Sequence, residues 1–159
     1  MDSMIDVLLR RSENEIILAE TLIRLSEDKA AKDFMNVPRA MTFYSGVISH
    51  SYYAIFYAAK AILLKNGIKT TAPEIHKKTY EAFKKTFVDT GILDIELLKI
   101  YKTIAIRAED LLGIFEKEKS KRGRFTYATI SQANKEPAED SLRNAKIFTT
   151  NIIKITEKK

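Results

Sequence analysis

Apolar residues recur every three to four positions along most of the chain, the spacing of one face of an α-helix. Turn residues are rare, with 5 Gly and 3 Pro in 159 residues, which favours a few long elements. The spacing predicts a helix from Ile5 to about Glu27, with a short stretch from Ala30 to Met35 that extends or caps it. Further helices are predicted over Pro38 to Asn66, Pro73 to Asp89, Leu93 to Gly123 and Pro137 to about Ile155.

The predicted central helix contains no Asp, Glu, Lys or Arg from Ala40 to Ala59. That length could cross a membrane. However, it carries three serines, a histidine and four tyrosines, and a bilayer disfavours so many polar groups. We therefore expect the core helix of a bundle and no membrane partner. The predicted class is all-α, a four- to five-helix up-and-down bundle forming a single domain over residues 1–159.

Composition narrows the possible chemistry. The chain has no cysteine and 2 histidines, which excludes disulfides, thiolate catalysis and multi-histidine metal centres. We expect no cofactor and no metal. The first residues, MDSMIDVLLRR, do not read as a signal peptide, so we expect a cytoplasmic protein.

The formal net charge is +6, which favours contact with phosphate. A heat-adapted surface would explain the same lysine surplus. The sharpest basic cluster comprises Lys117, Lys119, Lys121, Arg122 and Arg124. Its cations either complement the negative end of the fourth helix or form a phosphate-binding rim, beside which Phe125 and Tyr127 could stack on bases.

Several segments carry a resemblance to a known family. They are His50 to Gly67 (HSYYAIFYAAKAILLKNG), Glu74 to Lys77 (EIHK), Phe87 to Gly91 (FVDTG) and Arg122 to Tyr127 (RGRFTY). In this order they resemble the HEPN superfamily, particularly its small prokaryotic and archaeal members. Thr126 stands where that family usually has aspartate. Arg107 is a competing match for the family arginine; Arg122 keeps the spacing to Tyr127 and to the last helix, and implies a longer fourth helix.

The resemblance implies a helical bundle that is usually a homodimer, and often a toxin paired with a minimal nucleotidyltransferase as antitoxin. It also implies that catalytic members cut RNA with an Arg-x(4–6)-His motif. Cleavage of RNA without metal needs a group that moves a proton and a cation that holds the phosphate charge. No arginine of this chain has a histidine five to seven positions later. The standard ribonuclease motif is therefore absent.

His50 lies at one-turn spacings from Gly46, Tyr53 and Tyr57, which makes a polar stripe on the central helix. Such a stripe is either hydrogen-bonded within the core, with the tyrosines filling a helix interface, or faces a cleft or partner. His76, near a predicted helix start, is interpreted as a surface or capping residue, with contact to a phosphate as the alternative.

These observations favour a HEPN-like protein that binds nucleotide, RNA or a minimal nucleotidyltransferase without standard ribonuclease activity. One alternative is a metal-independent endoribonuclease toxin that uses Arg122 with Tyr127 or His50. Another is a structural helical adaptor. The candidate catalytic residues are Arg122 and Tyr127. The candidate nucleotide- or RNA-binding residues are Lys119, Lys121, Arg122, Arg124, Tyr127, His50 and Tyr53.

Overall fold

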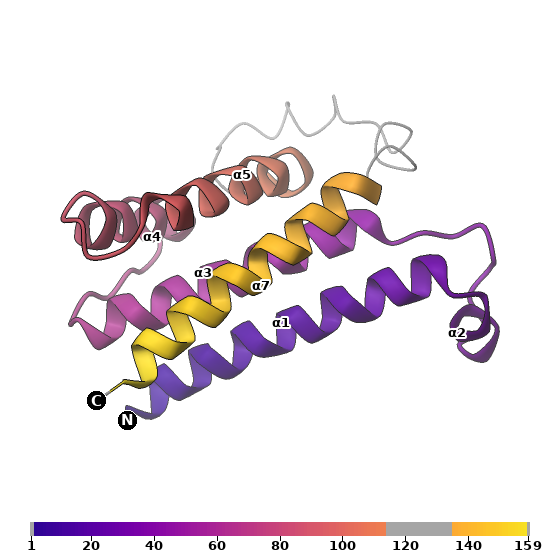
Figure 1. Ribbon diagram of the computed structural model, residues 1–159, viewed down its shortest axis with the longest axis horizontal. Coiled ribbons are helices and arrows are strands. Elements are labelled where there is room, and N and C mark those ends of the chain that lie inside the picture. The colour runs from indigo at the N-terminus through magenta and orange to yellow at the C-terminus, as the bar shows by residue number, and fades with distance from the viewer. Residues whose placement is uncertain (1, 114–134, 159) are drawn as a thin grey trace.

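The computed structural model describes residues 2–113 and 135–158 and confirms the all-α class, with no strand among these residues. The α-helices are α1 (Ser3–Glu27), α2 (Lys29–Phe34), α3 (Tyr44–Lys65), α4 (Ile75–Phe83), α5 (Ile95–Leu112) and α7 (Lys135–Glu157), and one π-helical segment, η1 (Lys84–Val88), follows α4. The four long helices α1, α3, α5 and α7 run alternately up and down, so that both chain ends lie at the same end of the bundle (Figure 1).

The first two helices are separate elements joined at one residue. The carboxylate of Asp2 accepts a hydrogen bond from the Met4 amide and caps α1. Asp28 ends α1 and caps α2, since its carboxylate accepts from the amides of Ala30 and Ala31. The stretch predicted to extend or cap the first helix is thus a helix with its own N-cap.

The central helix begins later than predicted, at Tyr44 instead of Pro38. A buried ammonium group holds the preceding chain in a non-helical path: Lys32, 4% exposed, donates to the carbonyl oxygens of Arg39 and Met41 at 2.6 and 2.7 Å. The end of α3 agrees with the prediction, because Gly67 follows it with a φ of 76°, a conformation that favours glycine.

Other predicted boundaries also differ from those of the structure. Helix α4 begins at Ile75 instead of Pro73 because Glu74 has a left-handed φ of 56°. Helix α5 ends at Leu112, where Gly113 adopts a φ of 61°, so one helix does not continue to Gly123. The last helix starts at Lys135, which places Pro137 in its first turn, where a missing N–H has little cost.

Helix α3 is the centre of the bundle and contacts α1, α4, α5 and α7. The main core lies where it meets α4, α5 and α7, around the buried rings of Tyr52, Phe83, Tyr101 and Phe148. Among the described helices, α3 is the one long and apolar enough to cross a membrane, but 67% of that stretch is buried inside the protein. Its apolar character is that of a core helix.

Candidate nucleic-acid interface

One face of α3 is left partly open to solvent. His50, Tyr53, Tyr57 and Lys60 follow one another at spacings of three or four residues and are all half-buried. The other faces of the helix are covered by α1, α5 and α7. The predicted polar stripe therefore exists, and Lys60 extends it by one turn.

His50 is fixed by a carboxylate of the neighbouring helix. Its Nδ1 lies 2.5 Å from Oε2 of Glu15 on α1, and the two side chains are 31% and 23% exposed. His50 is thus hydrogen-bonded, as in the first of the two alternatives, but it is half-buried and not within the core. The histidine lies at the edge of the α1–α3 contact, on the side of its helical turn that is not buried.

Cations lie over the aromatic rings of this face. The guanidinium carbon of Arg11, on α1, is 5.6 Å from the ring centroid of Tyr57, and Nζ of Lys60 is 5.6 Å from that of Phe56. Such cation–π contacts orient a positive group and leave it able to bind an anion. The rings of Tyr53 and Tyr57 are stacked with centroids 6.3 Å apart.

His76 joins this face from α4 and is not the surface or capping residue that was predicted. Its Nδ1 is 2.8 Å from the Tyr52 hydroxyl oxygen, and its ring lies 4.4 Å from that of Phe56. Burial, and secondarily the nearby charge of Lys60, lower the pKa of His76. The imidazole is therefore kept neutral by its surroundings at neutral pH.

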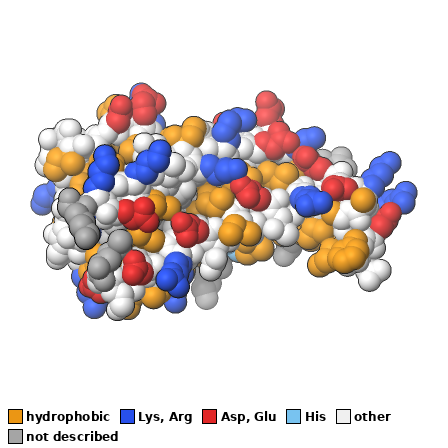
Figure 2. Space-filling model, turned by 60° about the horizontal axis from the view of Figure 1, so that its bottom comes forward, with side chains coloured by type: hydrophobic (Ala, Val, Ile, Leu, Met, Phe, Trp, Pro, Cys, Tyr) orange, Lys and Arg blue, Asp and Glu red, His pale blue; other side chains and the backbone are white. Residues whose placement is uncertain are grey.

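Three cations of this region, Lys60, Lys69 and Arg11, have no ion-pair partner among the described residues, although Glu15, which binds His50, adds negative charge beside Tyr53. Burial lowers the pKa of Lys60, and repulsion from Lys69 and Arg11 lowers it further. In the part of the chain that the structure describes, none of these three cations forms an ion pair. Two lysines of α7, Lys135 and Lys146, do bind glutamates of α1, and both signs intermingle on the side of the molecule shown in Figure 2.

We define the α3 interface as His50, Tyr53, Tyr57 and Lys60 with the flanking Arg11 and His76. It includes two predicted site residues, His50 and Tyr53. The others, Lys119, Lys121, Arg122, Arg124 and Tyr127, lie outside the described residues. Sequence reasoning missed Lys60, which the stripe's own spacing indicates, and Arg11, which no sequence signal associates with Tyr57. Within residues 2–113 and 135–158, no cluster of acidic or histidine side chains could hold a metal ion.

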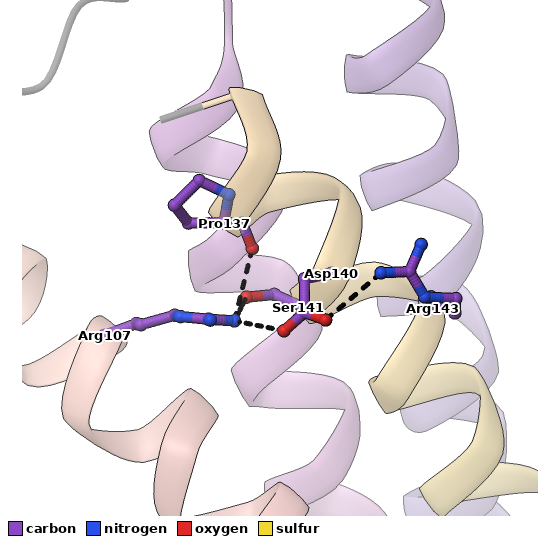
Figure 3. A network of polar contacts seen from close by, with 5 residues as sticks. All are labelled: Arg107, Pro137, Asp140, Ser141 and Arg143. Carbon is purple, nitrogen blue, oxygen red and sulfur yellow. Dashed lines mark hydrogen bonds and ion pairs between the residues drawn. The ribbon is translucent and has the colours of Figure 1, made fainter. Parts of the chain in front are cut away.

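Arg107, the competing match for the family arginine, connects α5 to the start of α7 (Figure 3). Its Nη1 is 2.8 Å from Oδ2 of Asp140, 2.9 Å from Oγ of Ser141 and 3.4 Å from the carbonyl oxygen of Pro137. Arg143 binds the other oxygen of Asp140. The hydrogen bond from Arg107 is the main reason why the pKa of Asp140 is lowered. Arg107 thus has a structural role.

Comparison with known proteins identifies the family. The model of the HEPN domain matches residues 28–155. The chain is 39% identical over 57 residues to a protein of Methanocaldococcus jannaschii that is named as a proposed toxin; the match spans 36% of this chain and 37% of that protein. It is also 29% identical over 110 residues to a UPF0332 protein of Thermotoga maritima, covering 69% of this chain and 70% of that one. The chain belongs to the HEPN domain family.

Proposed function

We propose that this HEPN-domain protein acts in a toxin–antitoxin-type system and binds RNA or nucleotide on the α3 interface without standard ribonuclease activity. The observation that carries the proposal is the pair of half-buried rings, Tyr53 and Tyr57, with the unpaired Arg11 over the ring of Tyr57 and the unpaired Lys60 one turn further along α3. Proteins hold single strands in this way: bases stack on aromatic rings, and cations attract the phosphates.

The toxin–antitoxin role rests on family membership and on the name of the M. jannaschii relative. Its partners are part of the proposal: a second copy of the chain, and a minimal nucleotidyltransferase. Light scattering at micromolar concentration tests the homodimer, and a monomer contradicts it. Co-expression with the product of the adjacent reading frame tests the other partner. A stable complex with a small nucleotidyltransferase supports it, and separate elution contradicts it.

RNA binding is tested by fluorescence anisotropy with a labelled single-stranded RNA. Because phosphate contacts release counterions, the affinity should fall linearly with salt on logarithmic axes. Tyr57→Leu keeps the volume but removes the stacking ring, so it should weaken binding about tenfold. Arg11→Ala should lower both the affinity and the salt slope.

Tyr80→Leu is the matched control. Tyr80 is also a half-buried tyrosine, but its ring packs on Tyr101 of the main core and is not part of the α3 interface. It should leave RNA affinity unchanged once circular dichroism has shown that the protein is folded. Equal losses for Tyr57→Leu and Tyr80→Leu, or no binding at low salt, would refute the proposal; the latter result favours a structural adaptor.

The contact between His50 and Glu15 favours a second function, metal-independent RNA cleavage. A carboxylate on one imidazole nitrogen orients the ring for proton transfer by the other. In this alternative His50 or Tyr127 would act with Arg122. Incubation of the protein with RNA in EDTA tests it. Cleavage that is abolished by His50→Gln or Arg122→Ala would replace the binding function by this one, and intact RNA would exclude it.

A further inference from the structure

A pocket of about 490 Å³ opens where the start of α1, the end of α3 and the segment from Ile68 to Ile75 meet. Its volume is in the range of small-molecule sites. Its lining residues are Asp2, Met4, Leu8, Lys60, Leu64, Ile68, Lys69, Thr70, Thr71, Ala72 and Ile75. We call it the α1–α3 pocket.

One wall of the α1–α3 pocket is apolar. Leu8 is buried, and Leu64, Ile68 and Ile75 are half-buried beside it. Branched aliphatic side chains in such an arrangement accept the face of a planar ring. At the lining of the pocket, the hydroxyl of Thr70 is 2.8 Å from that of Thr79 on α4. That internal hydrogen bond fixes the segment that bounds the pocket.

The polar side of the α1–α3 pocket carries positive charge. Lys60 and Lys69 line it together with the exposed Thr71. Neither lysine forms an ion pair in the described part of the chain, and each lies within electrostatic reach of the other. Two uncompensated ammonium groups suit a doubly charged phosphate better than a single carboxylate. Asp2 is the one acid of the lining, and its carboxylate is bound to the Met4 amide as the cap of α1.

The α1–α3 pocket is continuous with the α3 interface, because Lys60 belongs to both: it lies over the Phe56 ring and also lines the pocket. We propose that the pocket binds a nucleoside phosphomonoester, with the base against the apolar wall and the phosphate between Lys60 and Lys69. The ligand is either a free nucleotide or the phosphorylated end of an RNA strand that lies on the α3 interface. Binding of an RNA end rests on the proposed function, whereas binding of a free nucleotide in the pocket does not.

The experiment compares five ligands on the full chain: AMP, adenosine, and one RNA oligonucleotide with a 5′-phosphate, with a 3′-phosphate or without a terminal phosphate. AMP binding is measured by calorimetry and RNA binding by anisotropy. We expect AMP to bind about tenfold more tightly than adenosine, or one of the phosphorylated RNAs to bind about tenfold more tightly than the unphosphorylated strand.

Three variants locate the binding. Lys69→Ala should remove that preference and weaken the binding of unphosphorylated RNA much less, because Lys69 adds to the positive charge near Lys60 but is outside the α3 interface. Asp2→Asn should strengthen phosphate binding severalfold, since asparagine still caps a helix but carries no charge. Lys29→Ala is the control: this exposed lysine begins α2, at the far end of α1 from the pocket (Figure 1), and its loss should change nothing.

The outcomes separate the two proposals. Tight AMP binding that needs Lys69 supports a free nucleotide, and a preference for a phosphorylated end without AMP binding supports a strand terminus. RNA that binds without any phosphate preference, while AMP does not bind, overturns the pocket proposal and leaves the proposed function intact. AMP binding without any RNA binding supports the pocket proposal and overturns RNA binding on the α3 interface. Equal losses for Lys69→Ala and Lys29→Ala also overturn the pocket proposal.

Discussion

Arg107→Met is the most direct test of the contacts that join α5 to α7 (Figure 3). The substitution keeps an apolar stem of similar length and removes the guanidinium group. It therefore deletes the ion pair with Asp140 and the hydrogen bond to Ser141, while the packing of the side chain is largely preserved.

The expected cost follows from the burial of the partners. Arg107 and Asp140 are 28% and 34% exposed, so their ion pair should contribute at most about 1 kcal/mol. Ser141 is fully buried, and a buried hydroxyl that loses a partner costs about 1–3 kcal/mol. We expect Arg107→Met to lower the free energy of unfolding by about 2 kcal/mol and Tm by about 4–8 °C.

Arg143→Met is the control on the same carboxylate. Among the described residues, Arg143 forms a polar contact with Asp140 alone, at 3.1 Å, and its side chain is 66% exposed, so the loss should stay below about 0.5 kcal/mol. Urea unfolding followed by circular dichroism measures both variants. Equal effects within about 0.5 kcal/mol would refute the structural role of Arg107. A fully stable Arg107→Met protein with weakened RNA binding would make Arg107 the ligand-binding arginine instead.

The same network predicts a pH dependence. Because Arg107 lowers the pKa of Asp140 in the folded protein, the stabilisation is complete above the unfolded value of about 3.9 and is lost as pH falls below it. Arg107→Met should therefore lose less stability than the wild type between pH 5 and 3. An identical acid dependence in both proteins would contradict this assignment.

Three further predictions concern buried polar groups. Lys32→Met leaves two carbonyl oxygens without a donor and should cost about 2–4 kcal/mol, measured by urea unfolding, whereas Lys29→Met on the exposed side of α2 should cost little. Tyr101→Phe should be neutral or stabilising in a thermal melt, because the buried hydroxyl of Tyr101 has no hydrogen-bond partner in the described chain. By contrast, Tyr52→Phe removes a hydrogen bond to His76 and should cost about 1 kcal/mol. Because the pKa of His76 is lowered in the folded protein, this residue takes up a proton in the unfolded chain first as pH falls below about 6.5. The free energy of unfolding should therefore decline from pH 7 to 5, and His76→Gln should flatten that decline.

Local sequence determined the helical elements. The apolar spacing of α1, α3, α5 and α7 was sufficient to predict an all-α bundle, because burial of one face requires that period in the chain itself. Gly67 marked the end of α3 because its positive φ is a local property of glycine. The polar stripe with His50 and Tyr53 was also readable, since helical spacing alone puts these residues on one face.

Tertiary structure decided what each face meets. The start of α3 could not be predicted because Lys32, seven and nine residues before its acceptors, holds the preceding chain in a non-helical path. Whether the stripe was buried or open depended on which helices pack around α3. The approach of Arg11 to Tyr57 and of His76 to Phe56 depended on helices that are distant in sequence. Spacing determines which side chains share a face of one helix, but packing between helices determines which side chains of different helices meet and which remain open to a ligand.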